Sequence, residues 1–127
     1  MRILFKHLDV PDIDQIDVYL HEGGYEAAKK SVNGISPEEV IEVITKSGLR
    51  GRGGAGFPTG KKWDYIPKDP NLKKYLCCNA DESEPGTFKD RELMLRNPHQ
   101  LIEGMIICCY AIGSHRAFIY IRGEFIG

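Results

Sequence analysis

The sequence has no run of about 18 consecutive apolar residues, so a membrane span is not expected. Its first 20 residues carry several aspartates instead of the uninterrupted apolar segment of a signal peptide, and we expect a cytoplasmic protein. The sequence also has no excess of positive or negative charge. With 17 basic against 18 acidic residues, nothing attracts nucleic acid globally. The length of 127 residues and the 42% hydrophobic content suffice for one domain with a core.

The cysteines lack metal-binding spacing. The four of them form the neighbouring pairs Cys77-Cys78 and Cys108-Cys109, and neither pair has the C-x-x-C spacing of zinc, iron–sulfur or redox motifs. We interpret them as small apolar side chains in core elements, reduced as expected for a cytoplasmic protein. The four histidines are scattered and have no nucleophile signature nearby, so hydrolase chemistry finds little support.

Residues 1–48 predict a small helical region. Residues 3–5 suit a short strand, and residues 14–30 suit two helical pieces separated by a pair of glycines. Ser36 and Glu39 then form the capping box of the best-marked helix, which a glycine in the left-handed conformation can end.

Residues 49–127 predict a parallel βαβ core. A short helix is expected from Thr59 or Gly60, and a buried strand at residues 75–78. Asn97 signals the start of a helix of about fourteen residues, and a second strand follows at residues 117–121. This is the α/β pattern of a doubly wound domain, which would be only about half built at this length. We therefore expect an incomplete Rossmann-like domain in a partial chain.

The most informative segment is the glycine-rich stretch 48–62. Six of its first thirteen residues are glycine, and four cations stand among them. Glycine lets a ligand approach the peptide N–H groups closely, and such groups with nearby cations suit phosphate. The candidate binding residues here are Gly51, Arg52, Gly53, Gly54, Ala55, Gly56, Phe57, Gly60 and Lys62.

This loop fits neither of two familiar phosphate motifs. The dinucleotide fingerprint needs a strand before it, and here a capped helix precedes the loop. The P-loop fails because Ala55 replaces its first glycine and Lys61 is followed by Lys62 instead of serine or threonine. The alternative is a flexible linker, although linkers seldom embed Phe-Pro and lead into Lys-Lys-Trp.

A second polar segment, residues 79–86, follows the first predicted strand of the sheet. Ligands of open α/β sheets bind beyond the carboxyl ends of the strands. Asn79 can offer a donor and an acceptor to a heteroaromatic ring, and Asp81, Glu82 and Glu84 can accept bonds from ribose or ribityl hydroxyls. A Mg²⁺ site and a solvated acidic loop are the alternatives.

Two aromatic residues flank the glycine loop. Phe57 and Tyr65 could stack on a planar base, whereas aromatics at such spacing more often belong to the core. Trp63 is assigned to the core.

Two motifs together carry a family resemblance: Gly-Arg-Gly-Gly-Ala-Gly-Phe-Pro-Thr-Gly-x-Lys-Trp at 51–63 and Asn-Ala-Asp-Glu-Ser-Glu-Pro-Gly-Thr-Phe-Lys-Asp-Arg at 79–91. The chain closely resembles the NADH-binding flavoprotein component (F type) of respiratory NADH:quinone oxidoreductase, complex I, over residues 34–123 or so. Related diaphorase subunits occur in NAD-linked hydrogenases and formate dehydrogenases.

The resemblance implies a Rossmann-like domain that holds FMN, with NADH stacked against the flavin ring. It places three loop residues against the cofactors: Gly51, Gly53 and Gly54. By the same resemblance Lys62 would approach the flavin, and Asn79 and Asp81 would lie on its ring and ribityl side. NADH would then give a hydride to the flavin without a protein acid or base, so no catalytic side chain is expected.

The resemblance also implies contacts to NAD(H). Phe57 and Tyr65 would stack on the adenine. Glu84 would accept bonds from the ribose of NADH, and Glu82 would line the same pocket. Stacking and proximity would be the protein's main contribution.

Family members continue with a domain that holds a [4Fe–4S] cluster, whose cysteine motif this sequence does not contain. The expected partners are a small [2Fe–2S] protein and the peripheral arm of a larger membrane-associated complex, at the cytoplasmic side of the inner membrane. Three alternatives stay open: a diaphorase component of a hydrogenase or formate dehydrogenase, a truncated non-catalytic fragment, and a Mg²⁺-nucleotide-binding protein.

Overall fold

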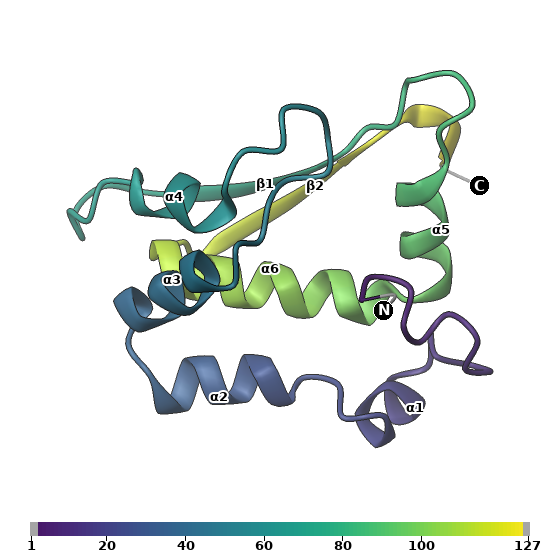
Figure 1. The fold of residues 1–127 in the computed structure, drawn as a ribbon, viewed down its shortest axis with the longest axis horizontal. Coiled ribbons are helices and arrows are strands. Elements are labelled where there is room, and N and C mark those ends of the chain that lie inside the picture. The colour runs from purple at the N-terminus through teal and green to yellow at the C-terminus, as the bar shows by residue number, and fades with distance from the viewer. Residues whose placement is uncertain (1–2, 126–127) are drawn as a thin grey trace.

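The computed structural model describes residues 3–125, which form a small parallel sheet packed on helices (Figure 1). In chain order the elements are α1 (Ile16–His21), α2 (Glu26–Gly34), α3 (Pro37–Lys46), α4 (Thr59–Asp64), β1 (Tyr75–Ala80), α5 (Lys89–Arg96), α6 (Pro98–Ile112), β2 (Arg116–Ile121) and a 3₁₀ turn (Gly123–Phe125). In the view of Figure 1, α6 runs between the sheet and α2. None of the helices in the described residues is long and apolar enough to cross a membrane.

The two strands pair in parallel, and α5 and α6 lie in the connection between them, which confirms the predicted parallel βαβ core. Helix α6 begins where predicted, because the side chain of Asn97 accepts a hydrogen bond from the Gln100 N–H at 3.2 Å. It ends at Gly113, whose φ of 70° is left-handed. The hydroxyl of Ser114 lies 2.9 Å from the carbonyl oxygen of Lys74 and so ties the beginnings of the two strands together.

The prediction of a buried first strand is wrong for one face of the sheet. Exposure alternates along β1, since the helices cover only one face among the described residues. On the other face Cys77 lies opposite Phe118 in the strand register, and both side chains are exposed. The ring of Phe118 also lies 6.3 Å from that of Tyr75.

The strand predicted at residues 3–5 is also wrong, because this segment forms bends and turns. Its backbone groups bond locally, with the Lys6 N–H donating to the carbonyl of Ile3 at 3.4 Å. A strand needs a neighbouring strand for those groups, and no described strand lies alongside. The two helical pieces that follow are α1 and α2, separated at the predicted glycines.

The capping box before α3 is confirmed. Ser36 Oγ accepts from the Glu39 N–H at 3.2 Å, and the Glu39 carboxylate accepts from the Ser36 N–H at 2.7 Å. The bond that the Ser36 N–H donates to the Glu39 carboxylate, and to a smaller extent the Ser36 hydroxyl, lowers the pKa of Glu39.

The core lies where α3 meets α6. Val40 and Ile41 of α3 pack with Ala111 of α6, and Trp63 packs against this cluster as predicted. Because α2 and α3 both contact α6, the helices before residue 48 lie directly on the later part of the chain. The domain boundary at residues 48/49 stays a prediction.

Candidate functional site

The glycine-rich loop joins α3 to α4 and is closed at its base (Figure 1). The Gly51 N–H donates to the carbonyl of Phe57 at 3.0 Å, and the Thr59 N–H donates to that of Leu49 at 2.9 Å. These bonds flank a backbone bridge between the two sides of the loop. Residues 52–56 therefore form a protruding tip on a fixed base.

The tip has the features of a backbone cradle. Gly54 and Gly56 have φ angles of 137° and 62°, conformations that L side chains rarely adopt. A Cβ atom built on Gly53 or Gly54 would meet nothing within 4 Å. The backbone here is thus open to close approach by a phosphate or a flat ring, while the exposed Arg52 adds a cation and Ala55 is exposed as well.

Gly60 differs from the glycines of the tip. It is buried, and a Cβ atom there would lie 2.1 Å from Thr45 Oγ1 and 2.7 Å from Thr45 N. The absence of a side chain at Gly60 lets α4 pack on α3, which orients the base of the loop.

The predicted aromatic pair lies together on the surface beside the loop. The rings of Phe57 and Tyr65 are 6.2 Å apart at an angle of 50°, and their exposed fractions are 45% and 64%. They therefore do not belong to the core. A base sandwiched between two rings needs them parallel and about 7 Å apart, so in this arrangement a base can stack only on an outer face.

The second candidate segment begins directly after β1. Asn79 Oδ1 accepts from the Asp81 N–H at 3.0 Å, and Ser83 Oγ lies within 3.1 Å of both oxygens of the Asp81 carboxylate. The amide hydrogens of Asn79 have no protein partner among the described residues. Asn79, Asp81 and Glu84 are exposed, so the segment presents one donor group and two carboxylates outward.

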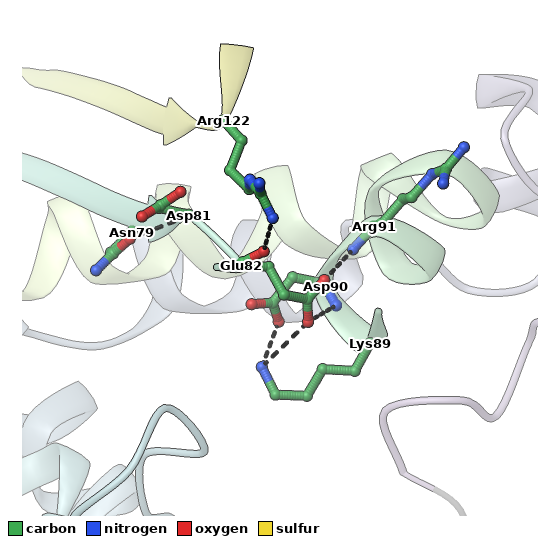
Figure 2. A network of polar contacts seen from close by, with 7 residues as sticks. All are labelled: Asn79, Asp81, Glu82, Lys89, Asp90, Arg91 and Arg122. Atoms are coloured by element: carbon green, nitrogen blue, oxygen red, sulfur yellow. Dashed lines mark hydrogen bonds and ion pairs between the residues drawn. The ribbon is translucent and has the colours of Figure 1, made fainter. Parts of the chain in front are cut away.

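Glu82 lies in the same segment but points inward (Figure 2). Only 2% of its side chain is exposed. Its carboxylate accepts from the backbone N–H groups of Asp90 at 3.0 Å and Arg91 at 3.2 Å, and so caps the beginning of α5. Lys89 Nζ lies 3.9 Å from the same carboxylate.

Arg122 holds the backbone of Glu82 from the other side. Its Nη1 donates to the Glu82 carbonyl oxygen at 2.9 Å, as Figure 2 shows. Sequence reasoning did not identify Arg122, which lies just after β2. One local feature indicated that a residue elsewhere must cap α5. The residue before this helix is Phe88, whose side chain cannot accept a hydrogen bond from the first N–H groups.

Lys62 lies on α4 with its side chain exposed. Burial, and to a smaller extent the neighbouring Cys109 thiol, raises the pKa of the Cys108 thiol in α6 to about 12. The Lys62 charge opposes both effects. All four cysteines are free, and residues 3–125 contain no cluster of three histidine, cysteine or acidic side chains suited to a metal.

The structure thus gives two loops with unengaged polar groups. In the view of Figure 1 both stand above the sheet, on the opposite side from α2. Within residues 3–125 no hydrogen bond or ion pair joins one loop to the other. A ligand spanning them would bind to backbone N–H groups on the first and to Asn79 and Asp81 on the second.

Comparison with known proteins gives concordant results. A family model described as the Nuo51 FMN-binding domain matches residues 44–126. The F subunit of the NADH-quinone oxidoreductase of Aquifex aeolicus (strain VF5) is 57% identical over 125 residues, covering 98% of this chain and 29% of that protein. The second F subunit of the same enzyme in Rhizobium meliloti (strain 1021) is 54% identical over 124 residues, covering 98% and 30%.

A solved structure is similar over nearly the whole chain. The crystal structure of an NAD⁺-reducing [NiFe]-hydrogenase in the air-oxidised state has a TM-score of 0.72 and 40% sequence identity, covering 96% of this chain and 19% of that one. The chain therefore spans less than a third of the length of these relatives.

Proposed function

The chain belongs to the Nuo51 FMN-binding domain family, and from this membership we propose that it is part of an NADH dehydrogenase. In this proposal the protein binds FMN and NADH and feeds electrons to iron–sulfur clusters and a quinone. The observation that carries it is the open glycine tip, with two glycines in left-handed conformations, together with the unengaged amide of Asn79 after β1. FMN, when bound, supplies the acceptor for the hydride of NADH.

The flavin side of the proposed site uses both loops. Backbone N–H groups at the tip bind phosphate, since their partial positive charges and the Arg52 cation favour an anion. Lys62 extends from α4 towards the flavin. Asn79 donates to the flavin ring, and Asp81 accepts from the ribityl hydroxyls. The backbone residues proposed for the cradle are Gly53, Gly54, Ala55 and Gly56. The N–H of Gly51 already donates to the carbonyl of Phe57, so Gly51 and Gly60 support the base of the loop instead.

The nucleotide side uses Phe57 and Tyr65 for the adenine. Because their rings are mutually tilted, the base stacks on an outer face, or the rings separate to admit it. Glu84 is exposed and accepts from the ribose of NADH. The protein thus contributes binding and orientation, and no proton transfer by a side chain is required.

The relatives are named as subunits of NADH-quinone oxidoreductase, which supports a place for this chain in a larger complex. We propose that the chain joins a small [2Fe–2S] protein in the peripheral arm of a membrane-associated complex. The likeness to an NAD⁺-reducing hydrogenase supports a diaphorase component as a second candidate. The identity of 57% to a quinone-linked relative, against 40% to the hydrogenase, favours the first.

The proposal is tested with the full gene product. The protein should quench FMN fluorescence and, once loaded, reduce ferricyanide with NADH. Glu84→Gln should raise the KM for NADH about tenfold or more and leave the FMN dissociation constant within about twofold, because the lost bond is a charged one to the nucleotide. Glu42→Gln is the matched control, an exposed glutamate paired with Lys46 on α3. Wild-type protein that neither quenches FMN nor oxidises NADH would refute the proposal.

A further inference from the structure

Glu82 is engaged on both its side chain and its backbone. Its carboxylate oxygens accept from two N–H groups at the start of α5, and its carbonyl oxygen accepts from Arg122 after β2. This one residue therefore connects the acidic segment to two separate elements, as Figure 2 shows. With 2% of the side chain exposed, no carboxylate oxygen is left facing a ligand.

The residues around Glu82 have the opposite character. Asp81 immediately before it and Glu84 two positions after it are exposed. Apart from Glu82, the segment is held by hydrogen bonds between residues close in sequence. For example, the Ser83 hydroxyl donates to the Asp81 carboxylate, and the Thr87 N–H donates to the Glu84 carbonyl. Such local turns shape the segment without fixing its place on the protein. The attachment at Glu82 sets where the two outward carboxylates lie.

We propose that Glu82 and Arg122 are positioning residues, and that Glu82 affects FMN and NADH only through Asp81 and Glu84. This inference rests on the proposed function and changes the expected role of Glu82, which the family resemblance placed in the pocket wall. Glutamate suits the role because an ionised carboxylate accepts from two converging N–H donors. An amide in its place would present a donor to one of them.

The first experiment is a double-mutant cycle in the full gene product. FMN binding is measured by fluorescence quenching for wild type, Glu82→Gln, Asp81→Asn and the double variant, well below their melting temperatures. Each single change should weaken FMN binding about tenfold, and the double variant should be no weaker than the poorer single. If Glu82→Gln misplaces the acidic segment, the contribution of Asp81 to FMN binding is already lost in that variant. The effects of the two substitutions on FMN affinity are then non-additive. Glu92→Gln, in a surface pair with Arg96 on α5, should bind FMN like wild type.

Hydrogen exchange gives a readout independent of activity. The amides of residues 81–91 should exchange faster in Glu82→Gln than in Glu92→Gln. For Arg122, substitution by methionine should weaken FMN binding, and lysine, which keeps a donor, should restore most of it. If Glu82→Gln does not fold, the two Arg122 variants test the positioning role by themselves.

Three outcomes would overturn the inference. Additive losses in the cycle would make Glu82 a direct ligand. A lowered melting temperature with unchanged FMN affinity and unchanged KM for NADH would make its role merely structural, as would full binding by Arg122→Met. In each case the wild type still binds FMN and NADH, so the proposed function stands. A wild type that binds neither would overturn both.

Discussion

Replacing Glu103 by glutamine is expected to loosen the beginning of α2. Glu103 lies on α6, and its carboxylate accepts from the Tyr25 N–H at 3.0 Å, from the Ala28 N–H at 3.2 Å and from the hydroxyl of Tyr19. The first N–H groups of any helix lack partners within the helix, and Tyr25 at the N-cap makes no side-chain cap bond. A residue 75 positions away therefore caps α2.

The magnitude follows from counting acceptors. The amide oxygen of glutamine can keep the two donors that share one carboxylate oxygen, Tyr19 and Tyr25, but its NH₂ group then faces the Ala28 N–H. Losing one bond to a charged acceptor and leaving that donor unpaired costs about 2 kcal/mol. At about 1.4 kcal/mol per factor of ten, the Ala28 amide should exchange with solvent roughly 30-fold faster.

The assay is residue-resolved hydrogen exchange under native conditions, which reports local opening whatever the length of the chain studied. Glu26→Gln is the matched control, because it removes the same charge from the first turn of α2, where Glu26 forms an exposed pair with Lys29. That change should cost about 0.4 kcal/mol, or roughly a twofold effect. Equal acceleration at Ala28 in the two variants would refute the capping role of Glu103.

Three further predictions concern stability. Gly60→Ala should destabilise the protein by about 1–3 kcal/mol, because the new methyl group would overlap Thr45, and an unchanged melting temperature would contradict the close α3–α4 contact. Burial, then the hydrogen bond to Glu103, raises the pKa of Tyr19. The protonated phenol is therefore favoured in the folded state. This stabilisation is complete below about pH 10, the pKa of an unfolded tyrosine, and is lost as the pH rises further. Between pH 9 and 12 the free energy of unfolding should fall more steeply with pH for wild type than for Tyr19→Phe. Parallel pH dependences in the two proteins would count against the raised pKa of Tyr19. Ser36→Ala should cost about 1 kcal/mol and speed exchange at the start of α3, and unaltered exchange would argue that the cap is dispensable.

Features encoded by neighbouring residues were predictable. The capping box at Ser36 and the Asn97 cap are local hydrogen bonds between residues three apart, so their sequence spacing indicates their geometry. The βαβ core followed from the lengths of the apolar runs. The turns at residues 3–5 were mispredicted because an apolar triplet has strand propensity whether or not a neighbouring strand exists.

Features that depend on distant residues were not predictable. Asp81, Glu82 and Glu84 are indistinguishable as sequence, and only packing shows that Glu82 is buried under α5 while the other two face outward. Glu103 and Arg122 gave no signal, since each bonds to backbone groups that lie far from it in the chain.

By itself, the sequence determined the family, the local caps, the order of the elements and the glycine and acidic loops that carry the candidate site. The tertiary structure alone decided that Gly60 serves the packing of two helices and that Glu82 holds the acidic loop in place. It also decided which face of the two-stranded sheet is exposed. The physical reason is that helix ends leave N–H groups whose acceptors are supplied by whichever side chains the fold brings near. Nothing in a local pattern encodes that proximity.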